Sequence, residues 1–300
     1  MHHKWLIAML SLIIAPAAAY GVMVLFARPA PNHPYFAAEK KGTQVIAHRG
    51  GAHLRPENTL AAFSHAVEIG ADVLDMDVQG TADGAIVCIH DPTVDRTTEG
   101  KGRVESFSLS GLRKLDAGHN WSGDGGRTYP YRGKGMRVPT LDEVFTRFPD
   151  TRMIVEMKQV GAAFAVPLCT LIRRSGMTEK VLVASMHEGA LAAFRKACPE
   201  VATSMSGNEA RIFYGIHLAR LATAYSPPVQ SLQIPYHLGG KVMATGGLVE
   251  MAHRRNLKVH VWTVSDDERM KELIRIGVDG IITERPDRLL TLLGRANKSR

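Results

Sequence analysis

The chain has 300 residues, of which 45% are hydrophobic, and it carries a formal net charge of +8. This length supports one large core, and the modest charged fraction of 22% excludes a mostly disordered protein. The basic residues are scattered and aromatic residues make up only 6%, which argues against a nucleic-acid-binding surface. We therefore expect one folded domain that suits anionic partners such as phosphate esters or acidic lipid headgroups.

The N-terminal region is strongly apolar. Residues 5–27 contain no charged side chain, and as a helix this stretch exceeds the hydrocarbon core of a bilayer, about 30 Å thick. We expect a single-pass membrane anchor over residues 1–28, followed by a Pro-rich linker over residues 29–43. The alternative is a signal peptide cleaved at the small residues Ala17–Ala19. Cleavage there would leave the apolar run 21–26 at the new terminus with nothing to bury it.

From residue 44 onward, short apolar runs alternate with segments of helical periodicity. This alternation predicts a parallel α/β architecture, which we interpret as one TIM-type (β/α)₈ barrel over residues 44–300. An open doubly wound sheet is the alternative, and no GxGxxG motif follows a strand to support it. The expected strands are Gln44–His48, Val73–Val78, Ala85–His90, Arg152–Glu156, Val181–Ala184, Leu232–Ile234, Lys258–Val264 and Gly280–Thr283. The expected helices include Asn58–Ile69, Leu141–Phe148, Glu188–Ala197, Gly246–Asn256 and Asp266–Ile276.

Residues 91–139 interrupt this alternation. They are rich in Gly, Ser, Arg and Asp, show little periodicity, and are too many for an ordinary connecting loop. We expect them to form an insertion above the barrel that shapes the pocket. The three cysteines, Cys88, Cys169 and Cys198, are odd in number and sparse, so we expect no disulfide framework. Cys88 stands in an apolar run and is expected to be a small buried hydrophobic residue.

Charged residues stand where the predicted strands end, which is where barrel active sites lie. Asp75 and Asp77 are two residues apart on one strand and therefore share a face, and Glu156 occupies the strand after the insertion. Three carboxylates that converge on one pocket would repel each other. They therefore predict one divalent cation that prefers oxygen ligands, Mg²⁺ or Ca²⁺, rather than zinc.

Two histidines stand at the same strand ends. His48 and His90 could accept and donate a proton near neutral pH, because the pKa of histidine is about 6.5. Arg49 and Lys158 could surround an anionic phosphoryl group with positive charge. Together these groups are those that cleavage of a phosphodiester requires. We assign Trp262, at the end of a late strand, to the lining of the pocket.

A series of short motifs follows one another along residues 44–290. They are His48-Arg49-Gly50-Gly51, Arg55-Pro56-Glu57-Asn58-Thr59, Asp75-Met76-Asp77, His90-Asp91-Pro92, Asp95-Arg96-Thr97-Thr98, Glu156-Met157-Lys158, Val261-Trp262-Thr263 and Gly277-Val278-Asp279-Gly280. No single motif is specific, but the whole series in this order resembles the glycerophosphodiester phosphodiesterase family. The resemblance implies a metal-dependent hydrolase on a TIM-type barrel that converts glycerophosphodiesters to glycerol 3-phosphate and an alcohol.

The resemblance also implies roles for particular residues. It implies metal ligation by Asp75, Asp77 and Glu156, acid–base roles for His48 and His90, phosphate or glycerol contacts from Arg49 and Lys158, and a place for Glu57 as a ligand or an orienting residue. Two positions depart from the usual family pattern. Asp75 stands where the family usually has Glu, which bears on the preferred metal, and Glu284 replaces an Asp and is interpreted as structural.

Two other functions are compatible with the same residues. A phospholipase D-type hydrolase of lysophospholipids or sphingolipids would use the same site chemistry, with an apolar lining from the insertion. A catalytically inactive, membrane-tethered binding protein is a more distant alternative. The presence of both histidines and of a carboxylate at every ligand position argues against it.

Overall fold

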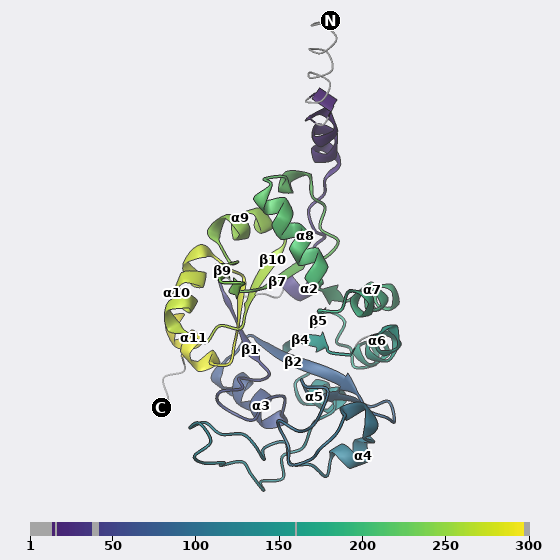
Figure 1. The fold of residues 1–300 in the computed structure, drawn as a ribbon, viewed down its shortest axis with the longest axis vertical. Coiled ribbons are helices and arrows are strands. Elements are labelled where there is room, and N and C mark those ends of the chain that lie inside the picture. The colour runs from purple at the N-terminus through teal and green to yellow at the C-terminus, as the bar shows by residue number, and fades with distance from the viewer. Residues whose placement is uncertain (1–13, 16, 38–41, 160, 297–300) are drawn as a thin grey trace, which may run out of the picture.

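The computed structural model describes residues 14–15, 17–37, 42–159 and 161–296, and within them eight parallel strands form a ring surrounded by helices (Figure 1). A parallel bridge between Ser204 and Ser231 brings the two ends of the sheet together, so the ring is nearly closed. The predicted TIM-type barrel is therefore confirmed over the open sheet. In order around the ring, the strands are β6 (Ala202–Thr203), β5 (Val181–Ala184), β4 (Arg152–Met157), β2 (Val73–Gly80), β1 (Gln44–His48), β11 (Gly280–Thr283), β10 (Lys258–Trp262) and β7 (Ser231–Pro235).

A helix follows each strand of the ring and packs on its outer face. Local sequence signals fix several of their ends: Thr140 and Glu143 form a capping box that begins α5, and Gly277 in a left-handed conformation ends α10. The outer helices are α3 (Leu60–Ile69), α5 (Leu141–Arg147), α6 (Ala165–Arg174), α7 (Glu188–Ala197), α8 (Gly207–Leu218), α9 (Gly246–Arg254), α10 (Asp267–Ile276) and α11 (Pro286–Leu292).

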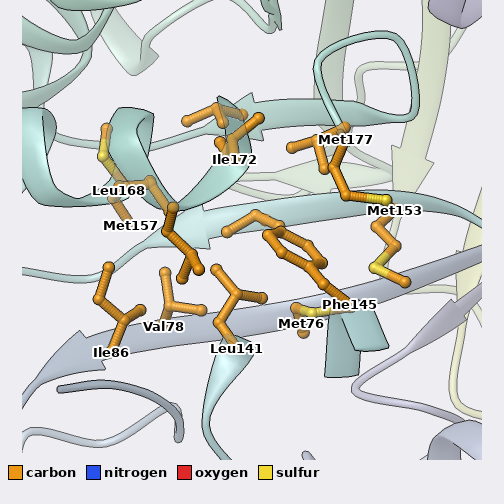
Figure 2. Packing of buried hydrophobic residues seen from close by; sticks show 14 of the residues in the cluster. Met76, Val78, Ile86, Leu141, Phe145, Met153, Met157, Leu168, Ile172 and Met177 are labelled. Carbon is orange, nitrogen blue, oxygen red and sulfur yellow. The ribbon is translucent and has the colours of Figure 1, made fainter. Parts of the chain in front are cut away.

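The largest apolar cluster lies between the sheet and the helices on the β2 and β4 side. Figure 2 shows Met76 of β2 and Met153 of β4 beside Phe145 of α5, with Ile172 of α6 above them. Each such side chain contributes about 1.5–3 kcal/mol when it is fully buried. This packing fixes the strands whose carboxyl ends carry the acidic residues.

The strand expected over residues 85–90 is real but lies outside the ring. It is shortened to β3 (Ile86–Cys88), which pairs antiparallel with the end of β2 as a hairpin. The segment between β3 and α5 contains a 3₁₀ turn, η1 (Val104–Ser106), and α4 (Leu109–Leu112), packed on an apolar cluster of its own. The Trp121 indole donates a hydrogen bond to the Ala52 carbonyl (2.9 Å), which ties this segment to the loop after β1.

A short N-terminal segment closes the end of the barrel where the strands begin. Helix α2 (Pro34–Ala37) places Tyr35 inside the ring, fully buried against a cluster that includes Ile46 and Leu182. Before it, the Ala30 amide donates to the Arg255 carbonyl (2.8 Å), just ahead of β10. The expected linker over 29–43 is therefore in part a folded piece of the barrel rather than an extended spacer.

Residues 17–26 form an apolar helix that projects from the barrel beside α8 (Figure 1). Within residues 14–15, 17–37, 42–159 and 161–296, no helix has both the length and the apolarity to cross a membrane. Part of the expected anchor, namely residues 1–13 and Pro16, lies outside the described residues. The expected transmembrane helix is therefore not supported by the described structure.

Two of the cysteines are paired. Cys169 of α6 and Cys198, just after α7, form a disulfide with a Cα–Cα distance of 5.6 Å. This bond was not predicted from the sequence, because three sparse cysteines do not indicate a disulfide framework. Cys88 is a free and buried thiol, as predicted. A β-hairpin of β8 (His237–Leu238) and β9 (Lys241–Val242) follows β7.

Candidate active site

A cavity of about 200 Å³ opens where the strands of the barrel end. Of the nine residues that the sequence assigns to the site, seven line it: His48, Arg49, Asp75, His90, Glu156, Lys158 and Trp262. The other two, Glu57 and Asp77, stand behind this lining and hold its charged groups. The rest of the wall includes residues that the sequence did not indicate, namely Ser185, Met186, Ser204, Met205 and Gln233.

His48 is the last residue of β1, and a carboxylate lies beside one side of its ring. Its Nδ1 lies 3.5 Å from Glu284 Oε1, and the other oxygen of Glu284 lies 2.7 Å from His53 Nε2. Burial alone would lower the pKa of His48, but the carboxylates of Glu284, Asp75 and Asp77 outweigh it and raise this pKa. Glu284, interpreted from the sequence as structural, therefore lies beside a candidate catalytic group.

His90 is held by a chain of charges that begins in the insertion. Its Nδ1 lies 2.6 Å from Asp91 Oδ1, and the Arg96 guanidinium donates to the other oxygen of Asp91 (2.7 Å). The hydrogen bonds from Arg96 lower the pKa of Asp91 to about 2, so Asp91 stays ionised beside the imidazole. Arg96 also donates to both oxygens of Glu57, each at 2.7 Å.

Arg49 directs its guanidinium between two carboxylates. Its Nη1 donates to Glu57 (2.9 Å), and its Nε lies 3.1 Å from Asp77 Oδ2. The backbone of Arg49 is in the left-handed region (φ 51°), a conformation that residues other than Gly rarely adopt. The next residue, Gly50, also has a positive φ of 83°, and a Cβ there would lie 2.7 Å from the Cβ of Ala62. This tight turn presents Arg49 to the cavity.

Asp77 is almost completely enclosed by donors. Lys158 Nζ lies 3.1 Å from its Oδ1, and the Asn58 side chain donates to its Oδ2 (3.0 Å). Burial opposes its ionisation, but Lys158 and Arg49 outweigh burial and lower the pKa of Asp77. Lys158 Nζ also lies 2.8 Å from Glu156 Oε1, so this ammonium group bridges the two carboxylates.

Asp75 is different because no cation among the described residues forms an ion pair with it, although the charges of His48 and Lys158 partly oppose the rise of its pKa. It lines the cavity, and burial, with smaller contributions from Asp77 and Glu156, raises its pKa to about 7. A nearby cation would stabilise the ionised form of this buried carboxyl group. The site therefore has an unbalanced carboxylate at the position that the sequence assigns to a metal ligand.

The expected metal ligands fit a divalent cation by their chemistry, because Asp75, Asp77 and Glu156 offer carboxylate oxygens on neighbouring strands. Over the described residues, however, they do not form a group of three whose ligand atoms all lie within 4.8 Å of one another. Lys158 now sits between two of them. One described group, Cys169, Cys198 and Glu200, meets that distance, but its cysteines are joined in the disulfide and offer no thiolate.

The barrel fold, two histidines that each lie beside a carboxylate, and the cations Arg49 and Lys158 in one cavity are the features of a barrel hydrolase of phosphate esters. A model of the glycerophosphoryl diester phosphodiesterase family matches residues 48–288. A glycerophosphodiester phosphodiesterase of Caldanaerobacter subterraneus is 36% identical over 257 residues, 84% of this chain and 98% of that one. The chain therefore belongs to the glycerophosphoryl diester phosphodiesterase family. Members of this family generally use a divalent metal.

Solved structures agree with this assignment. A glycerophosphodiester phosphodiesterase of Agrobacterium tumefaciens superposes with a TM-score of 0.66 at 26% identity, covering 83% of this chain and 99% of that one. A phosphodiesterase of Oleispira antarctica, solved with the product sn-glycerol-3-phosphate, has a TM-score of 0.67 at 23% identity over 88% of this chain and all of its own. The second likeness bears on the fold alone.

Proposed function

We propose that this enzyme hydrolyses glycerophosphodiesters to glycerol 3-phosphate and an alcohol, with His48 and His90 as its acid–base pair. The observation that carries the proposal is that both histidines line one cavity and each is approached by a carboxylate, Glu284 or Asp91. The name of the Caldanaerobacter subterraneus relative, a glycerophosphodiester phosphodiesterase, supports this substrate class here.

The residues of the cavity divide the chemistry between them. Arg49 and Lys158 would bind the phosphoryl oxygens and oppose their negative charge. One histidine, neutral, takes the proton of the attacking oxygen of water or of a substrate hydroxyl. The other, protonated, gives its proton to the oxygen of the alcohol as the phosphorus–oxygen bond breaks. The carboxylates beside the two rings would fix their orientation.

A divalent cation, Mg²⁺ or Ca²⁺, would be held by Asp75 and Glu156 on the cavity wall and by Asp77 behind them. When bound, it would polarise a phosphoryl oxygen and neutralise the carboxylates. In that arrangement the ammonium group of Lys158 would be released from its two carboxylate partners. It would then be free to contact the phosphate.

The direct test is product analysis with the purified full-length chain. Glycerophosphocholine, glycerophosphoethanolamine and lysophosphatidylcholine would be supplied with Mg²⁺, Ca²⁺ or a chelator. We expect glycerol 3-phosphate from the glycerophosphodiesters, only with metal. A cavity of about 200 Å³ favours these small diesters over a lysophospholipid. Lysophosphatidic acid as the main product would replace this proposal with the phospholipase D-type alternative.

We also propose that residues 5–27 anchor the enzyme in a membrane, with the barrel on an oxidising side. The uncharged stretch supports the anchor, and the Cys169–Cys198 disulfide supports the oxidising side, because such bonds persist mainly outside the cytosol. Fractionation with intact-mass analysis tests the anchor: a soluble protein that starts near Tyr20 would contradict it. Thiol labelling without reductant tests the side, since a barrel in the cytosol would carry three free thiols instead of one.

A further inference from the structure

A mixed apolar and basic surface lies far from the cavity, where α8, the loop after it and the end of α9 meet. We define this basal patch by Leu218, Arg220, Leu221, Arg254 and Arg255. All five residues belong to segments that lead toward the amino ends of β7 and β10, opposite the carboxyl ends that form the active site. The catalytic residues therefore make no use of it.

The apolar part of the basal patch is unusually exposed. Leu218 is 66% exposed and Leu221 is 47% exposed, and Ile212, further along the outer side of α8, is 58% exposed. Single exposed leucines are ordinary, but a row of them at the end of one helix and the start of its loop is typical of a contact surface. Nothing within the described chain covers these side chains.

The basic part lines a cavity of about 890 Å³. Among the described residues of its wall, Glu250 is the acidic one. Its Oε1 forms an ion pair with Arg254 Nη2 at 2.6 Å. Arg220 and Arg255 form no ion pair within the described ranges, and Arg255 Nε and Nη2 are buried there without a hydrogen-bond partner. Burial lowers the pKa of His217 in the same wall, so the positive charge at neutral pH comes from the arginines.

The basal patch is also continuous with the apolar N-terminal helix. The Arg28 amide, two residues beyond this helix, donates to the Ser226 hydroxyl in the loop after Leu221 (3.0 Å). The last residues of the helix, Leu25 and Phe26, are 82% and 78% exposed. Figure 1 shows that the helix leaves the barrel beside α8. One flat partner could therefore meet the helix and the basal patch together.

We propose that the basal patch docks on the surface of an anionic lipid bilayer. Arginines would bind lipid phosphates, and Leu218 and Leu221 would enter the interface between headgroups and acyl chains. Charge complementarity selects this partner over a second copy of the chain, because two copies of an arginine patch would repel. This contact with the bilayer would not depend on which substrate the enzyme hydrolyses.

A site-specific fluorescence experiment tests this contact in the full-length protein. A Leu218→Cys variant would carry an environment-sensitive dye, and a Val166→Cys variant would carry the same dye on α6, at a site that is 62% exposed but outside the patch. Both would be reconstituted with brominated lipids, in phosphatidylcholine alone or mixed with phosphatidylglycerol. We expect strong quenching at position 218 in the anionic vesicles, and little quenching at 166.

Charge reversal separates docking from simple proximity to the N-terminal helix. The pair Arg220→Glu and Arg255→Glu, added to the labelled Leu218→Cys protein, should remove most of the quenching, as should high salt. Equal quenching at 218 and 166, or quenching that is indifferent to both charge reversal and salt, would overturn the proposal. A dimer by light scattering in which the dye at 218 is shielded without lipid would also overturn it. None of these measurements depends on turnover.

Discussion

Arg96 donates two hydrogen bonds of 2.7 Å to Glu57, one to each carboxylate oxygen. Arg96 belongs to the segment after β3, whereas Glu57 belongs to the loop after β1, so this pair joins two distant parts of the chain at the edge of the cavity. Because Arg96 also holds Asp91 and Glu57 holds Arg49, the pair connects a candidate acid–base group with a candidate phosphate-binding group. The orientation of both therefore depends on one guanidinium.

Loss of this guanidinium should reduce turnover without removing a reacting group. Arg96→Ala should lower kcat by about 10- to 100-fold, because the bidentate contacts that orient Asp91 and Glu57 disappear. Arg96→Lys keeps the charge but not the fork, and should recover only part of the rate. The control is Arg103→Ala, whose partner Glu105 is an exposed neighbour. Equal kinetics in the Arg96 and Arg103 variants would show that Arg96 has no positioning role.

The two histidines should be the most sensitive positions for turnover. His48→Ala and His90→Ala should each lower kcat by about 10²–10⁴-fold, the usual contribution of a positioned acid or base. His119→Ala, in the insertion and outside the cavity wall, is the matched control. Steady-state kinetics with circular dichroism on each variant would separate lost catalysis from lost folding. Turnover near wild type in both single variants would remove the histidines from the mechanism.

Asp75 should make metal binding depend on pH near neutrality. Its pKa of about 7 in the metal-free enzyme means that it is mostly protonated below pH 7, and a cation must then displace the proton. The apparent metal affinity should therefore rise about tenfold per pH unit up to about pH 7 and level off above it. Calorimetric titration with Mg²⁺ or Ca²⁺ between pH 5.5 and 8.5 would measure this, with Asp75→Asn as the comparison. An affinity independent of pH over that interval would exclude Asp75 as a ligand.

The disulfide should stabilise the side of the barrel built from α6 and α7. It closes a segment with a sequence separation of 29 residues, which corresponds to about 3–4 kcal/mol of unfolding free energy in the chain-entropy model. The paired change Cys169→Ser and Cys198→Ser should lower the urea midpoint accordingly. The wild-type enzyme in a reductant should show the same shift. A reductant that has no effect would mean that the bond is absent in the protein as purified.

Asp279 should contribute to stability through its ionised form. Burial opposes its ionisation, but the side chains of His253 and Lys258 and a backbone amide outweigh burial and lower its pKa from 3.8 to about 2. Because the folded pKa lies below the unfolded value, the stabilisation is complete above about pH 4 and is lost as the pH falls through 2. Asp279→Asn should therefore cost about 2 kcal/mol at neutral pH and less in acid. Urea unfolding at pH 7 and pH 3 would measure both values.

The sequence predicted the barrel because short apolar runs alternate with segments of helical periodicity. It predicted most of the cavity wall because polar motifs stand at the ends of the predicted strands. Strand β6 was missed because two residues carry no periodicity. Helix α8 was not among the helices named from the sequence, and it buries little besides Phe213 while it exposes apolar residues. The roles of Glu284 and Arg96 could not be predicted, because each depends on a partner brought close only by the fold, although both residues stand inside recognisable motifs.

The burial of Tyr35 in the amino end of the barrel has a practical consequence for anyone who divides this chain. A domain that begins at residue 44, where the sequence pattern begins, would lack the Tyr35 side chain that is buried inside the amino end of the barrel. It would also lose the contacts of Ala30 and His33 with the loops that precede β10 and β6. The cut that preserves the barrel lies before residue 28. The same contacts mean that the apolar helix is not carried on a loose tether, because the segment that follows it is built into the floor of the enzyme.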